Sequence, residues 1–256
     1  MKELLLALPA GRSTQGARFG LTPAHMAYRV GLGLRLLGQR LPDGLRGGLM
    51  LLSCAGLEGG GDPVNCCRQV LGECRRRGYR GIVCDFEGMP SDVLGRTAEI
   101  LARNCAAQGW PLYVPEPYAP RAPGSRVLIP SAVTSGTLER RLREAAERYG
   151  PHRTALAVEW VREDFPLPAA GRGEPVDQEA LDEMLRRLQP ATFFDQGLCA
   201  HYFTYMAGPK AHFVLYDSPR SIREKLGLAR RLGLCAALLP QPEIEAHLEE
   251  IFGPNA

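Results

Sequence analysis

The sequence predicts an α/β fold, an irregular (β/α)8 TIM-type barrel of eight parallel strands with their helices outside. Short apolar runs alternate with amphipathic helices, which in one sheet gives parallel strands covered by helices. From residue 62 onward each predicted helix is followed by a glycine, the residue that best supplies a left-handed cap. A chain of 256 residues also has the length of one barrel, so we expect a single domain over residues 1–256.

Helices are expected where a capping residue or a proline opens an amphipathic stretch and a glycine closes it. Asp62-Pro63 opens one that stops at Gly78, and further helices follow at 90–109, 137–149 and 218–232. The segment Leu21 to Gln39 is also predicted as a helix. The segments left as strands are Glu3–Leu8, Gly48–Ser53, 81–87, Pro111–Val114, Arg126–Pro130, Thr154–Trp160, Phe213–Tyr216 and Cys235–Leu239.

A doubly wound open sheet is the competing architecture, because it has the same alternation of strands and helices. That fold commonly binds nucleotides through a glycine-rich turn after the first strand. Here no G-x-G-x-x-G follows the first strand, and Gly59-Gly60-Gly61 lacks the lysine of a phosphate-binding loop. The sequence therefore favours the barrel and predicts no nucleotide cofactor.

Composition excludes several classes of function. The net charge of +3 is too small to predict nucleic-acid binding. No apolar run reaches the roughly 18 residues that a membrane-spanning helix needs. The apolar start, Met1 to Ala10, carries Glu3 and is predicted as a strand rather than a signal peptide.

The cysteines and histidines predict neither a disulfide framework nor a metal site. Several of the eight cysteines fall on apolar helix faces or within strands, as small buried hydrophobic residues do. Cys66-Cys67 has no C-x-x-C partner, and the five histidines form no H-E-x-x-H motif. We therefore expect reduced cysteines, a cytoplasmic location and no metal or other cofactor.

The most informative stretch is R-G-I-V-C-D-F-E-G, residues 80–88, in which an apolar strand runs into Asp85 and Glu87. Residues at i and i+2 of a strand share a face, and at a strand's carboxyl end that face can line the mouth of a barrel. Two carboxylates in an enclosed site do not both ionise easily, so one pKa should rise. We expect the raised pKa on Glu87 as a general acid. The alternative is an acidic loop in which Asp85 only caps a helix.

Three motifs together resemble glycoside hydrolase family 18, the chitinase-like barrels, and most of all its spore-peptidoglycan hydrolases. Residues 81–87 (GIVCDFE) resemble the D-G-x-D-x-D-x-E strand of the family, and residues 51–56 (LLSCAG) resemble the S-x-G-G strand end before it. Residues 216–225 (YDSPRSIREK) resemble the segment that precedes the final strand, and 153–168 resemble the seventh strand with its loop. The resemblance covers roughly residues 47–240.

The resemblance implies a chemistry and a role for each carboxylate. In the family the glutamate protonates the glycosidic oxygen, and the N-acetyl carbonyl of the substrate is the nucleophile, an exception to the usual two-carboxylate mechanism. By resemblance Glu87 is the general acid, and Asp85 orients the acetamido group and stabilises the positive ring that forms.

The sequence also departs from the family pattern. Val83 stands where the family has an earlier aspartate, and Arg80 replaces the opening aspartate. The strand ending at Ser131 lacks the tyrosine that bonds the acetamido carbonyl, and the last strand ends in Pro240 instead of a tryptophan.

Other polar and aromatic residues near strand ends are candidates for sugar binding, because aromatic rings stack on pyranose faces. They are Tyr113, Glu116, Glu159, Trp160, Tyr202 and Tyr205. For Tyr202 and Tyr205 the alternative is core packing. For Glu159 it is a salt bridge with an arginine such as Arg162, whereas a position opposite Glu87 would allow a two-carboxylate mechanism.

We therefore expect an enzyme that hydrolyses a β-linked N-acetylhexosamine polymer, chitin-like or peptidoglycan, with a glycan as its partner and neither nucleic acid nor membrane. The alternative is a non-catalytic carbohydrate-binding or interaction barrel that has kept the fold and lost the chemistry. The retained Asp85 and Glu87 favour the enzyme, and the replacements at Val83, Ser131 and Pro240 favour the alternative.

Overall fold

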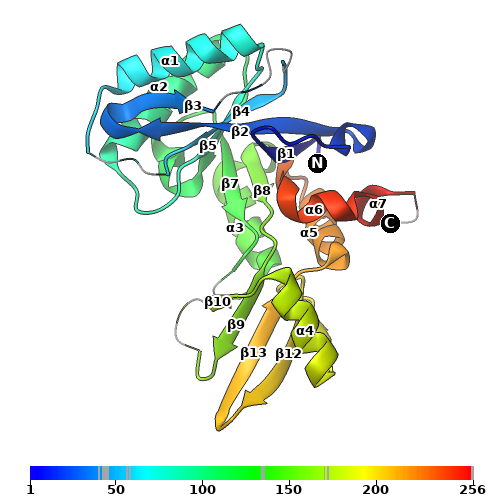
Figure 1. Cartoon of the computed structure of the whole chain (residues 1–256). Coiled ribbons are helices and arrows are strands. Elements are labelled where there is room, and N and C mark those ends of the chain that lie inside the picture. The colour runs from blue at the N-terminus through cyan, green and yellow to red at the C-terminus, as the bar shows by residue number, and fades with distance from the viewer. Residues whose placement is uncertain are drawn as a thin grey trace.

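Eight parallel strands close into a barrel, which confirms the predicted fold class (Figure 1). The computed structural model describes residues 1–39, 41, 46–55, 57, 59–133, 136–169, 171 and 173–254. In order around the barrel the strands are β1 (Glu3–Pro9), β2 (Leu21–Gly31), β4 (Leu49–Ser53), β5 (Ile82–Asp85), β6 (Leu112–Pro115), β7 (Arg126–Pro130), β8 (Thr154–Ala157) and β14 (Ala236–Pro240). Strand β1 pairs with both β2 and β14, which closes the ring.

The four helices predicted from residue 62 onward form where the sequence places them. They are α1 (Pro63–Arg77), α2 (Asp92–Ala107), α3 (Leu138–Tyr149) and α5 (Pro219–Arg231). Three further α-helices in the described residues were not predicted, among them the short α6 (Gln241–Ile244) and α7 (Leu248–Phe252) after β14. The Asp62 carboxylate caps α1 by accepting from the Val64 amide at 2.9 Å, and Gly78 ends the helix at φ +68°. Short 3-10 helices cover Gly16–Phe19, Leu32–Leu34, Glu116–Arg121, Pro151–Arg153 and Glu245–His247.

The predicted helix at Leu21 to Gln39 is wrong, because this segment forms β2 and the antiparallel strand β3 (Arg35–Gly38). The leucine spacing suits a helix, but Gly31 and Gly33 lie in the interior of the segment, where glycine disfavours a helix. Gly33 adopts φ +66° at the turn, a conformation outside the helical region. Strand β2 thereby becomes the second strand of the barrel.

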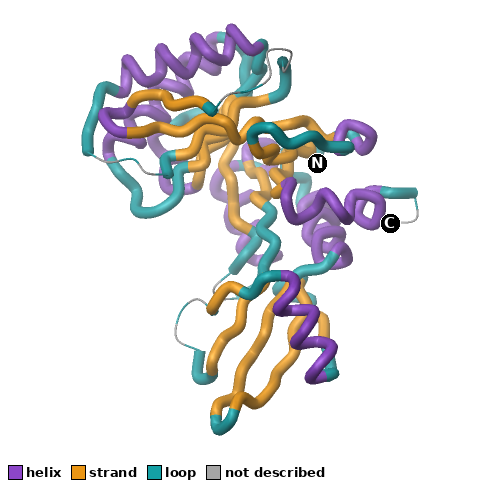
Figure 2. The backbone as a smooth tube through the Cα atoms, viewed as in Figure 1, coloured by secondary structure: helices purple, strands orange, loops and turns teal. Residues whose placement is uncertain are grey.

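Phe213–Tyr216 is likewise not a barrel strand, because it is part of β13 (Lys210–Tyr216) in a second sheet. That antiparallel sheet also contains β9 (Arg162–Pro166), β10 (Glu174–Pro175), β11 (Phe193–Asp195) and β12 (Ala200–Ala207). Its residues, 162–216, are inserted between β8 and α5, and Figure 2 shows the sheet projecting from one end of the barrel. An apolar run predicts a strand but not which sheet the strand joins. Phe213–Tyr216 was therefore wrongly counted among the barrel strands.

The barrel and the inserted sheet have separate cores. Side chains from Leu5, Leu51, Val83, Leu128 and their neighbours fill the barrel interior. In the insertion, Leu181 of helix α4 (Gln178–Leu188) packs on Phe203 and Val214 of the sheet. The single domain over residues 1–256 stays a prediction.

The eight cysteines are all buried and free of disulfides, as the sequence predicts. Burial raises the pKa of several of these thiols, Cys84 well above its ordinary value. In the described part of the chain, no helix combines the length and the hydropathy needed to cross a bilayer.

A buried ion pair joins the insertion to the barrel. Lys225 of α5 and Asp217, which follows β13, meet at 2.6 Å with side chains 1% and 0% exposed. The Asp217 carboxylate also accepts from the Val161 amide at 2.8 Å, and the Lys225 ammonium donates to the Glu159 carbonyl at 3.3 Å. Both chain segments that cross between barrel and insertion are therefore held at one point.

Replacing Lys225 by methionine should lower the free energy of unfolding by about 3–5 kcal/mol, because Asp217 would remain buried without its counter-charge. Urea denaturation of wild type and variant measures this loss. Lys210→Met, which removes an exposed ammonium from β13, is the matched control and should change stability little. A Lys225→Met variant as stable as this control would show that the pair does not anchor the insertion.

Candidate functional site

Strand β5 carries Asp85 to the mouth of the barrel. Ile82 and Cys84 belong to the outer core under the helices, whereas Val83 belongs to the barrel interior. Asp85 is two residues after Val83, so its side chain takes the inward side at the carboxyl end of the strand. It is paired in register with Ser53 of β4, two residues after the inward Leu51.

Burial and the nearby charge of Glu87 raise the pKa of Asp85 to about 6. Glu87 itself follows the end of β5 and is exposed, and its backbone carbonyl accepts a hydrogen bond from the Cys54 thiol at 3.4 Å. The sequence predicts that the two carboxylates together raise a pKa in this pair, and in the structure Asp85 has such a raised pKa.

A pocket of about 500 Å³ opens beside Asp85. Ser53 and Leu51 line it from β4, and the β2–β3 hairpin forms its outer wall through Met26, Arg29, Leu37 and neighbouring residues. This volume lies within the range of small-molecule sites. The hairpin residues are not among the site residues that the sequence predicts, because the leucine spacing of Leu21 to Gln39 predicts a helix. Gly31 and Gly33 are the signal that could have revealed a strand pair.

Tyr113 lies at the opposite end of the barrel from the mouth. Its side chain is fully buried, and its hydroxyl donates to Glu3 at 2.7 Å near the start of β1. Arg126 bonds both partners, reaching Glu3 at 2.5 Å and also the Tyr113 hydroxyl. Burial raises the pKa of Tyr113. These three residues close the bottom of the barrel, so Tyr113 does not reach the pocket.

Glu116 is held in ion pairs on the outside of the barrel. Its carboxylate pairs with Arg141 and with Arg148, the latter at 3.5 Å, and accepts from the Tyr149 hydroxyl at 3.3 Å. All three partners lie on α3. Through these contacts Glu116 links the end of β6 to α3.

Glu159 and Trp160 follow β8 and line a second pocket, of about 280 Å³, with residues of β9 and β10. The Glu159 carboxylate accepts from the Ala132 amide at 2.7 Å, and the Trp160 ring stacks on His247 at 5.3 Å. Arg162, the partner that the sequence suggested for Glu159, instead donates to the Val176 carbonyl at 3.2 Å and to the Gln178 side chain at 3.1 Å. Glu159 does not line the pocket that contains Asp85.

Tyr202 and Tyr205 lie on opposite faces of the inserted sheet. Tyr205 packs on the side of α4, and its hydroxyl donates to Asp164 at 2.6 Å. Tyr202 is on the other side, where its ring stacks on Phe193 at 5.4 Å and on Phe213 at 5.2 Å. Neither tyrosine lines the pocket beside Asp85.

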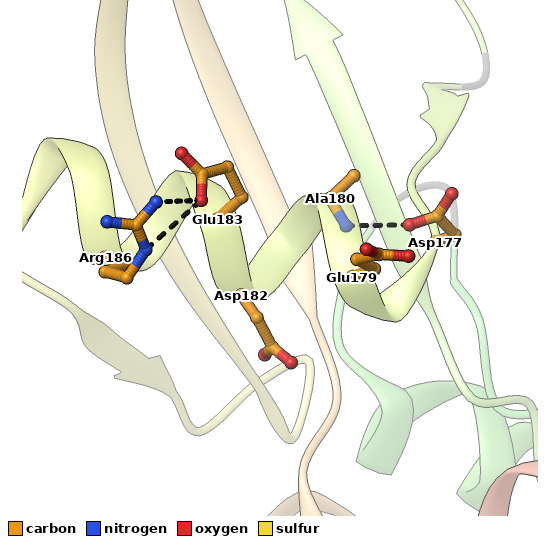
Figure 3. A pocket seen from close by; sticks show the side chains of 6 residues that line it. All are labelled: Asp177, Glu179, Ala180, Asp182, Glu183 and Arg186. Carbon is orange, nitrogen blue, oxygen red and sulfur yellow. Dashed lines mark hydrogen bonds and ion pairs between the residues drawn. The ribbon is translucent and has the colours of Figure 1, made fainter.

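A further hollow lies over α4, far along the sequence from the Asp85 strand (Figure 3). Three of its four carboxylates have structural partners: Asp177 caps the helix by accepting from the Ala180 amide at 2.7 Å, Asp182 accepts from the Gln178 side chain at 2.8 Å, and Glu183 pairs with Arg186. Over the ranges that the structure describes, no three or more metal-ligating side chains come together.

No family model and no curated protein matches the sequence. Solved structures do match its fold. A chitinase from Chromobacterium violaceum has a TM-score of 0.69 at 17% identity, over 93% of this chain and 94% of that one. The spore cortex-lytic enzyme SleL of Bacillus cereus has a TM-score of 0.67 at 16% identity, over 98% and 74%.

A third match, a glycoside hydrolase family 18 chitinase of Cycas revoluta in complex with (GlcNAc)3, covers 98% of both chains with a TM-score of 0.63 at 13% identity. The fold is that of the family 18 barrels. The low identities agree with a divergent sequence.

Within the family 18 fold, the departures from the motif have structural consequences. Val83 is fully buried in the barrel core, so no carboxylate lies beneath Asp85 on this strand. Ser131 is buried too, and its hydroxyl accepts from the Glu159 amide at 2.9 Å, which ties the ends of β7 and β8 together. Gly56, the last residue of the 51–56 motif, lies outside the described residues.

Replacing Asp85 by asparagine should stabilise the protein above pH 6. Its carboxyl has a pKa of about 6 in the folded protein against an ordinary 3.8. The folded state therefore binds more protons, and stability falls as the pH rises from about 4 to 6. This fall, on the order of 1–3 kcal/mol, should be absent from Asp85→Asn.

Urea denaturation at pH 4 and pH 7 measures the effect. Asp182→Asn, which removes an exposed carboxylate from α4, controls for the loss of one surface charge. The prediction fails if wild type and Asp85→Asn lose the same stability between the two pH values.

Proposed function

We propose that this chain is a glycoside hydrolase that cleaves a β-linked N-acetylhexosamine polymer, with Glu87 as general acid. The observation that carries the proposal is Asp85, a partly buried carboxyl with a raised pKa in a mouth pocket, two residues before Glu87. The family 18 fold and its neighbours support the same reading, since they include chitinases and spore cortex-lytic enzymes.

In the proposed reaction Glu87 protonates the glycosidic oxygen, and the acetamido carbonyl of the substrate attacks the anomeric carbon. Asp85 accepts a hydrogen bond from the acetamido N–H and stabilises the positive charge that develops on the sugar ring. The deprotonated Glu87 then activates a water molecule that opens the intermediate and restores the acid. A glutamate at the open rim suits this role, because the leaving sugar and the water must both reach it.

The proposed partner is an N-acetylhexosamine glycan, neither nucleic acid nor membrane, and the proposed location is the cytoplasm. Two of the matching structures are Cycas revoluta chitinases in complex with GlcNAc oligomers. Eight buried, free cysteines support a reducing compartment.

The second candidate is a barrel that binds a glycan without cleaving it. Val83, Ser131 and Pro240 favour this candidate, because each occupies a position where the family motif has a catalytic or sugar-binding side chain. Binding without turnover would distinguish it from the enzyme.

Glu87→Gln should lower the rate of hydrolysis by about 2–4 orders of magnitude, because glutamine keeps the shape but cannot donate the proton. The assay follows release of reducing ends from GlcNAc oligomers and from peptidoglycan fragments. Glu139→Gln, an exposed glutamate of α3, is the matched control and should keep full activity.

Two results would change the assignment. If wild type binds these glycans but turns over none of them, the non-catalytic barrel is the correct function. If hydrolysis occurs and survives Glu87→Gln, another group is the acid, and Glu159 becomes the next residue to replace.

A further inference from the structure

The mouth pocket contains a cation that the family motif does not account for, Arg29 of β2. Its neighbours Tyr28 and Val30 both belong to the outer core, so Arg29 takes the opposite, inward side of the strand. It is paired in register with Ser53, which is paired in turn with Asp85. The three polar side chains thus form one row across β2, β4 and β5, and all three line the pocket.

The Arg29 guanidinium has no ion pair or hydrogen bond with any residue that the structure describes, although it is exposed in a pocket shared with a carboxyl group. Neighbouring strands are about 4.8 Å apart, so the backbones at Arg29 and Asp85 are separated by roughly 10 Å. That spacing leaves room for a ligand group between the two charges. Five N–H donors in a planar fork match a carboxylate better than any neutral group.

We propose that Arg29 is a specificity-determining residue that selects acidic N-acetylhexosamine glycans, whose sugars carry a carboxylate on a short side chain. This inference rests on the proposed function, because it names the substrate class of the same pocket. The carboxylate binds the Arg29 guanidinium on the hairpin side, and the sugar ring extends across Ser53 toward Asp85.

The walls around Arg29 favour a small acidic ether such as a lactyl group. Leu37 is directly opposite Arg29 in the hairpin, and Met26 lies on the same strand; both are partly exposed apolar side chains that line the pocket. A lactyl group carries a methyl and a carboxylate on one carbon, so it can contact the apolar wall and the guanidinium together. A neutral glycan has no anionic group that could pair with Arg29. The guanidinium would then stay hydrated and would contribute no ion pair to binding.

The test compares binding of two tetrasaccharides with the same β-1,4 N-acetylhexosamine backbone, one neutral and one with 3-O-lactyl groups on alternate sugars. Isothermal titration uses the full-length Glu87→Gln protein, so that hydrolysis does not disturb the measurement. We expect tighter binding of the acidic ligand, and Arg29→Gln should weaken it about tenfold while leaving the neutral ligand nearly unchanged. Arg29→Lys should keep part of the preference, because it retains the charge but not the fork.

Arg35→Gln is the matched control, since Arg35 is an exposed arginine of the same hairpin that does not line the pocket. It should leave both affinities unchanged, and equal melting temperatures should confirm that each variant folds. Equal affinity of the two ligands, or an equal loss of both in Arg29→Gln, would overturn the inference and leave the proposed hydrolase intact. Failure of the proposed function is separate, because it requires that wild type cleave neither glycan.

Discussion

The hydrogen bonding of β1 to both β2 and β14 is the constraint on which the rest of the molecule depends. It turns an eight-stranded sheet into a ring, so that one face of every strand must point into a common interior. The apolar side chains on those faces fill the interior, and the Glu3, Tyr113 and Arg126 cluster closes one end. At the other end, the residues at the carboxyl ends of the strands extend beyond the packed interior and are accessible to a ligand. The candidate site therefore lies at this end of the barrel.

The position of Asp85 has an energetic cost that the fold imposes. Its carboxyl lies above Val83 and Leu51 and beside Glu87, so ionisation places a second negative charge in a partly dry site. On β5 no side chain beneath it can share a proton, because Val83 occupies that position. A group that destabilises the folded state when charged is typical of functional sites, where stability is exchanged for chemistry.

The sequence was sufficient for features that depend on local chemistry and insufficient for those that depend on partners far along the chain. Capping signals placed α1, α2, α3 and α5, and the i, i+2 rule gave Asp85 its inward side. The same local evidence failed at Leu21 to Gln39, where a hairpin pairs with β1 and β4, and at Phe213–Tyr216, where the strand joins the inserted sheet. Tyr113 looked like a strand-end ligand because local pattern does not show at which level of the barrel a side chain lies.

The departures from the family motif and the pocket beside Asp85 lie on different sides of the barrel mouth. In the family that the sequence resembles, a tyrosine and a tryptophan bind the sugar from two strands. The corresponding strands here are β7, which is followed by Ser131, and β14, which ends at Pro240. Ser131 is instead buried in a bond between strand ends. The pocket beside Asp85 is built on the other side, by β2, β3 and β4. The hairpin that sequence patterns mistake for a helix thus provides the only wall of that pocket, within the described residues, that carries a cation. The barrel core is built from other residues than the rim, so polar side chains can differ from one side of the mouth to the other without altering the core.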